Sequence, residues 1–138
     1  MNLKKLPVHL HHIGSHFTNG LFPVASVLLV MYFVTGDREM EAAAFYCALF
    51  GTLAIPLTYL SGGYDWRTRF QGRRTAIFTH KLIFGVLFFL LAAGAIALRV
   101  ADPEAVAVGG GIGIAYASAV WLATGCATYL GHLGSKFI

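Results

Sequence analysis

Six histidines are the residues of this chain best suited to chemistry. They are His9, His11, His12, His16, His80 and His132. A neutral imidazole can bind a transition metal or a haem iron, and its charge changes near physiological pH. His12 and His16 are spaced i, i+4, so a helix over residues 9 to 19 would place both on one face, where a metal could bridge them.

Three of the histidines belong to three different apolar segments and lie at similar depth near one side. His16 stands at the entry of the first segment, His80 about two turns into the third, and His132 at the exit of the fourth. Ionisable groups at membrane depth are costly unless they pair, ligate or face water. The first hypothesis is therefore a b-type haem held by two imidazoles from facing helices.

His80 and His16 are the favoured iron ligands, and His132 is the competing second ligand. In a bundle with short connections, the third helix lies diagonal to the first, and the wider diagonal gap better accommodates a porphyrin. Arg73 and Arg74 precede His80 and could pair with haem propionates at the membrane edge. The alternative is that these histidines sit among lipid headgroups without binding a cofactor.

Other chemistries find little support in the sequence. There is no H-E-x-x-H motif, no phosphate-binding loop, no dinucleotide fingerprint and no set of nucleophile, base and orienting group. Asp65 lies in GGYDWRTR, where pairing with Arg67 or Arg69 is expected. Cys47 and Cys126 lie within apolar runs and are expected to be inert buried thiols.

The composition of this chain is that of a membrane protein. Hydrophobic residues make up 57% of its 138 residues and charged residues only 12%, with a mean hydropathy of +0.70. Soluble domains are about one quarter charged. A helix needs about 20 mostly apolar residues to cross a bilayer, so four crossings use nearly the whole chain.

The hydropathy pattern predicts an all-α membrane protein, a single four-helix transmembrane domain over residues 1–138. The expected spans are about 16–35, 41–60, 74–98 and 106–130. Pro23 is expected in the first turns of the first span, where proline is tolerated. Pro56, late in the second span, is expected to kink that helix and free a carbonyl one turn earlier.

Charge beside the spans predicts an up-down-up-down bundle with both termini in the cytoplasm. Basic residues concentrate on the cytoplasmic side of a membrane protein. The other side holds only Arg38 and Arg99, together with five acids. Eight of the ten basic residues fall on the predicted inner side: Lys4, Lys5, Arg67, Arg69, Arg73, Arg74, Lys81 and Lys136. The same distribution argues against a nucleic-acid partner, despite a pI near 9.3.

Small residues crowd the fourth span and predict close helix packing. Gly109 and Gly113 give a G-x-x-x-G spacing. The favoured interpretation is packing inside the monomer's own bundle, and the alternative is a homodimer through this face.

Several of these motifs together resemble a bacterial family of small four-helix membrane proteins catalogued as a domain of unknown function. The first motif is His16-x5-Phe22-Pro23-Val24-Ala25. The second runs from Gly62, Gly63, Asp65 and Trp66 through Arg73 and Arg74 to His80. The third is the closing Gly131-His132-Leu133-Gly134. Members of that family often carry a second histidine directly before the Phe-Pro, where this chain has Leu21. The resemblance implies membrane redox work, because such domains occur fused to Rieske iron-sulfur or cytochrome c modules. The bundle is also similar in general design to the cytochrome b anchors of quinone-linked dehydrogenases.

The sequence thus favours a b-type haem-binding electron-transfer subunit of the bacterial inner membrane. It would exchange electrons between the quinone pool and a redox partner, and any enzymatic role would be that of a membrane subunit in an oxidoreductase complex. The alternative is a cofactor-free structural or anchoring subunit, whose basic rim would hold a peripheral partner. A metal or proton transporter is disfavoured, because no ionisable residue lies in the outer halves of the predicted spans.

Overall fold

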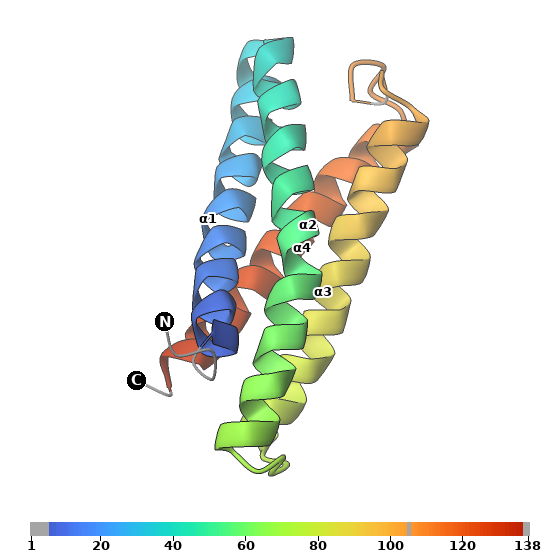
Figure 1. The fold of residues 1–138 in the computed structure, drawn as a ribbon. Helices are drawn as coiled ribbons and strands as arrows, with labels where there is room; N and C mark the ends of the chain where they lie inside the picture. The colour runs from blue at the N-terminus through green and yellow to red at the C-terminus, as the bar shows by residue number, and fades with distance from the viewer. Residues whose placement is uncertain (1–5, 105, 137–138) are drawn as a thin grey trace.

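The computed structural model describes residues 6–104 and 106–136, which form four helices and no strand (Figure 1). The helices are α1 (Leu6–Thr35), α2 (Arg38–Arg69), α3 (Ala76–Ala101) and α4 (Gly111–Ser135). Each is long and apolar enough to cross a membrane. The predicted all-α transmembrane bundle is therefore confirmed, and the chain is a multi-pass membrane protein.

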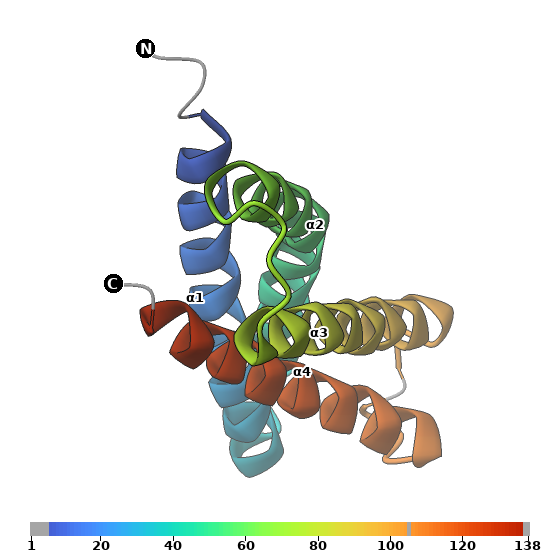
Figure 2. The ribbon, with the colours of Figure 1, turned by 90° about the horizontal axis from the view of Figure 1, so that it is seen from below.

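Successive helices run in opposite directions, as predicted. The α2–α3 connection and both ends of the chain lie at one end of the bundle, and the other two connections lie at the opposite end (Figure 1). The largest interfaces join α1 to α2 and α3 to α4, while α1 with α4 and α2 with α3 share smaller ones. Two helical hairpins thus cross each other (Figure 2), with α1 diagonal to α3.

Four helix boundaries lie five or more residues from the predicted spans. Helix α1 begins at Leu6 rather than near residue 16, α2 continues to Arg69 rather than residue 60, and α4 runs from Gly111 to Ser135 rather than from 106 to 130. The hydropathy pattern marks only the apolar part of a helix, whereas backbone hydrogen bonding continues through polar residues; the late start of α4 follows from the turn at Gly109. Because α1 begins at Leu6, Pro23 lies in its interior, and the predicted place of this proline in the first turns was wrong.

Local signals explain where the connections fall. Gly36 has a φ of 73°, a conformation that glycine adopts without strain, and its N–H donates to the Tyr32 carbonyl at 2.7 Å. Asp37 then caps α2, accepting a hydrogen bond from the Glu39 N–H at 2.9 Å. Gly109 has a φ of 67° and lies before α4. The Gly109 and Gly113 pair is therefore not a helical G-x-x-x-G face, and that expectation was wrong.

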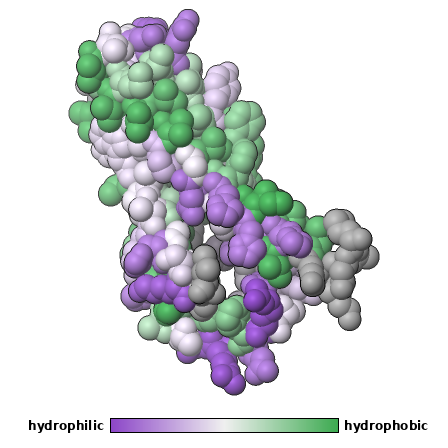
Figure 3. Space-filling view, turned by 90° about the vertical axis from the view of Figure 1, so that its left-hand side faces the viewer, coloured by the Kyte–Doolittle hydropathy of each residue, from purple (hydrophilic) through white to green (hydrophobic). Residues whose placement is uncertain are grey.

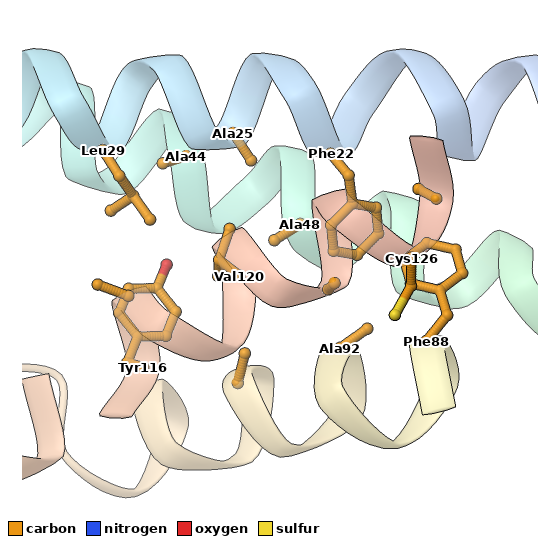
Figure 4. Packing of buried hydrophobic residues seen from close by; sticks show 14 of the residues in the cluster. Phe22, Ala25, Leu29, Ala44, Ala48, Phe88, Ala92, Tyr116, Val120 and Cys126 are labelled. Carbon is orange, nitrogen blue, oxygen red and sulfur yellow. The ribbon is translucent and has the colours of Figure 1, made fainter. Parts of the chain in front are cut away.

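Small side chains fill much of the core, so that the helix backbones approach closely (Figure 4). Phe22 of α1 and Phe88 of α3 meet edge to face across the diagonal, with ring centroids 4.8 Å apart. Tyr116 is fully buried, and its hydroxyl has no hydrogen-bond partner among the described residues. The fully buried alanines are Ala25, Ala44, Ala92, Ala95, Ala123 and Ala127. Close packing inside the bundle is thus confirmed, whereas the homodimer stays a prediction.

Three glycines create the space for these helix contacts. A side chain at Gly14 would overlap Thr58 of α2, and one at Gly51 would meet the Phe22 ring at 2.7 Å. A side chain at Gly85 of α3 would meet the Tyr59 ring at 2.5 Å. Any larger residue at these positions would force these neighbouring side chains to shift.

Candidate functional site

All six histidines lie at the end of the bundle that holds both termini. Four of them are on the first turns of α1, His80 is on the first turns of α3, and His132 is in the last turn of α4. Figure 3 shows the face over α1, where hydrophilic side chains gather in the lower half. The predicted grouping of the histidines at one end is confirmed, while the side of the membrane they face stays a prediction.

His80 is oriented by a specific partner on the neighbouring helix. Its Nδ1 lies 2.9 Å from the Tyr129 hydroxyl of α4. The Tyr129 ring packs against Phe84 at a centroid distance of 4.5 Å, and the His80 ring lies 6.3 Å from Tyr129 and 6.4 Å from Phe84. His80 itself is exposed. Either group can donate in this hydrogen bond, because a tyrosine hydroxyl both donates and accepts. In the tautomer with the proton on Nδ1, the Nε2 lone pair is free for a metal.

His16 lies on the opposite side of α1 from the bundle core. It is two residues from both Gly14 and Thr18, which are buried, and two residues span about 200° on an α-helix. Its side chain is accordingly exposed. Among the described residues, His16 makes no hydrogen bond or ring contact with His80, so the structure does not bring the favoured ligand pair together.

His132 lies near the end of α4, the helix whose Tyr129 contacts His80. It follows Tyr129 by three residues, which places both on neighbouring turns of one side of α4. His132 is exposed. Tyr129 therefore connects the surroundings of His80 with those of His132, although the described contacts do not join the two imidazoles directly.

His11 is the histidine whose placement the sequence reasoning missed. Its Nδ1 lies 2.9 Å from the Thr58 carbonyl of α2; because a carbonyl can only accept, Nδ1 carries the proton and a neutral His11 has its lone pair on Nε2. The ring fills a notch at Gly62, where a Cβ would come within 2.7 Å of it. His11 shares a helix face with Gly14 and Thr18, and only the fold shows that this face is buried.

Arg73 and Arg74 occupy the α2–α3 connection at the same end. Both are exposed, and the Arg73 carbonyl accepts a hydrogen bond from the Trp66 indole N–H at 2.8 Å. Thr75 then caps α3, so His80 follows within the first two turns. The arginines thus lie in the connection that leads into the helix of His80.

Asp65 is an acidic group at this end of the bundle. Asp65 lies 3.5 Å from Arg69 one turn later, which confirms one of the two predicted partners. Lys4 and Lys5, which contributed to the predicted orientation, lie outside the described residues.

The residues fit a cofactor held at the edge of the bundle better than an ion enclosed by it. Within residues 6–104 and 106–136, no group of three or more His, Cys, Asp or Glu side chains could hold a metal ion. A haem needs only one or two imidazoles, since the porphyrin supplies the other ligands. His80, exposed and oriented, meets that smaller requirement.

Comparison with known proteins gives a family and no activity. The family model "Predicted membrane protein (DUF2231)" matches residues 7–136, nearly the whole chain. The chain therefore belongs to this family, which confirms the resemblance to small membrane proteins of unknown function. No curated protein and no solved structure matches it.

Proposed function

We propose that this family member is a membrane electron-transfer subunit that binds a b-type haem at its histidine-bearing end. It would pass electrons between the quinone pool and a redox partner in the bacterial inner membrane. The observation that supports this most is the contact between His80 Nδ1 and the Tyr129 hydroxyl. Histidines that ligate metals commonly donate their other ring N–H to an oxygen, which sets the tautomer and the ring orientation.

The haem would lie against the outer flank of α3 and α4. The core between the helices is closed by Phe22, Phe88 and buried alanines, whereas His80 is exposed beside Phe84 and Tyr129. Aromatic rings beside the iron ligand would cover one face of the macrocycle. Exposed Arg73 and Arg74 could pair with its propionates where the span ends.

The position of Tyr129 favours His132 over His16 as the second ligand. His132 is one turn from the tyrosine that His80 contacts, whereas among the described residues no hydrogen bond or ring contact joins His16 to His80 or Tyr129. A methionine in place of the true second ligand should keep the haem but raise its potential and shift its spectrum. His132→Met is therefore expected to show this change and His16→Met to leave the spectrum unaltered; the reverse result would restore His16 as the partner of His80.

An absorption spectrum of the purified protein, oxidised and then reduced with dithionite, tests the proposal. Bound haem should give a Soret band and sharp α and β bands after reduction. His80→Ala should abolish them, while the matched control His9→Ala, also exposed at this end, should not. Tyr129→Phe should retain the ligand but weaken haem binding by about 10- to 100-fold, the usual effect of losing such a supporting contact. An unchanged low-spin spectrum in His80→Ala would exclude His80 as a ligand.

A cofactor-free anchoring subunit is the second candidate. The exposure of His9, His12, His16 and His132 supports it, because imidazoles at a membrane surface can simply remain hydrated. This function predicts a protein that carries no haem when expressed with adequate haem supply. It also predicts that neutralising Arg73 and Arg74 releases a peripheral partner without changing any spectrum.

A further inference from the structure

A half-open cavity of about 200 Å³ lies at the end of the bundle opposite the histidines. It is lined by the end of α1, the start of α2, the end of α3 and the connection that follows α3. Its polar lining consists of Tyr32, Arg38, Glu41, Arg99 and Glu104, and the remaining walls are alanine, valine and proline. The cavity thus combines two positive and two negative side chains at the level where the spans end.

The inner wall of the cavity is a fixed ion pair. Arg99 donates from Nε to Glu41 Oε1 at 2.6 Å and from Nη2 to Glu41 Oε2 at 2.8 Å. The two side chains are only 17% and 9% exposed, and the Arg99 guanidinium also stacks over the Phe45 ring at 5.3 Å. Bidentate contacts of this kind are strong and geometrically specific. This pair shapes the cavity and is not expected to exchange partners.

The rim of the cavity is a second ion pair of a different character. Arg38 Nη1 lies 2.8 Å from Glu104 Oε2, and these side chains are 68% and 60% exposed. Exposed pairs contribute little to stability. The rim pair can therefore separate at little cost, leaving a free guanidinium and a free carboxylate at the mouth.

We propose that the cavity binds a zwitterion that carries an ammonium group and an oxyanion a few bonds apart. The oxyanion would pair with Arg38, next to the positive N-terminal end of α2, and the ammonium with Glu104, beyond the negative C-terminal end of α3. A ligand of one sign is less suitable, because it would leave one member of the rim pair unpartnered. Phosphoethanolamine has this chemistry, either as the headgroup of phosphatidylethanolamine or as a free molecule.

Binding of short-chain phosphatidylethanolamine to the delipidated protein in detergent tests the proposal by native mass spectrometry or calorimetry. Glu104→Gln and Arg38→Gln should each weaken binding at least tenfold, and the matched control Glu39→Gln, on the first turn of α2 outside the cavity, should not. Phosphatidylcholine, whose ammonium has no N–H, and phosphatidylglycerol, which has no cation, should bind at least tenfold more weakly. Because the substituted side chains are exposed, unchanged helicity by circular dichroism should verify the fold.

The two sources of the ligand are separated by a further titration with free phosphoethanolamine. If free phosphoethanolamine binds with the same affinity as the lipid, the proposal is supported and the ligand is a soluble zwitterion. If only the lipid binds, the proposal is supported and the ligand is a lipid headgroup. Equal binding of all three lipids, or equal effects of the Glu104 and Glu39 variants, would overturn it. Each of these results is independent of whether the histidine-bearing end binds haem.

Discussion

Removal of both partners of the Glu41 and Arg99 pair should destabilise the bundle less than the two single removals added together. The pair joins α2 to α3, one of the smaller interfaces of the bundle. Glu41→Ala leaves the Arg99 guanidinium largely buried without its carboxylate. Loss of one partner of a buried pair costs about 3–5 kcal/mol. Because these side chains retain 17% and 9% exposure, the expected loss for Glu41→Ala is near the lower value, about 3 kcal/mol.

The magnitude is measured by a double-mutant cycle in detergent micelles. Unfolding of Glu41→Ala, Arg99→Ala and the double variant is followed by circular dichroism during titration with sodium dodecyl sulfate. The double variant should lose less stability than the two single losses added together, because no uncompensated charge remains. The matched control is the exposed Arg38 and Glu104 pair, whose single alanine variants should each lose about 1 kcal/mol or less.

Two results would refute this reasoning. A loss below about 1 kcal/mol for Glu41→Ala would show that water or lipid headgroups solvate Arg99 as well as the carboxylate does. Strict additivity in the double variant would show that the two side chains do not stabilise each other, whatever their distance.

Three further predictions concern packing and topology. Gly14→Ala should cost about 1–3 kcal/mol in the same unfolding assay, because its Cβ would overlap Thr58; Gly20→Ala, with open space around it, should cost nothing, and equal losses would contradict the packing argument. Tyr116→Phe should be neutral or gain about 1 kcal/mol, since it deletes a buried hydroxyl without a partner among the described residues; a loss of stability would reveal a partner such as bound water. A reporter fused after Ile138 should read as cytoplasmic and one inserted at residues 36–37 as external, and export of the first would invert the predicted orientation.

The number and direction of the helices could be predicted from the sequence. Each crossing requires a long apolar run, and the connections are short, so hydropathy alone sets the span count and the antiparallel order. The same logic placed His16, His80 and His132 at one end. These features depend on local composition, which is read directly from the sequence.

Only the tertiary structure decides whether a side chain points toward the core or toward the lipid. Hydropathy cannot distinguish the core-facing and lipid-facing sides of a membrane helix, because both are apolar. The helix start at Leu6 and the buried Gly14 and Thr18 set the rotation of α1, which turns His11 inward and His16 outward. The sequence indicated His16 because of its expected depth in the membrane. The depth of a residue does not determine which side of the helix its side chain faces.

The partners of the polar groups were likewise decided by the fold. Tyr129 beside His80, and Glu41 beside Arg99, are separated by 49 and 58 residues. Nothing in the local sequence relates the members of either pair. His80 and Tyr129 meet inside the α3–α4 hairpin, where the two helices pack against each other. Glu41 and Arg99 meet where the two hairpins pack, an approach that small residues such as Gly85 permit. The sequence alone determined which groups are present at each depth, whereas only helix packing, through steric fit, decided which of them touch.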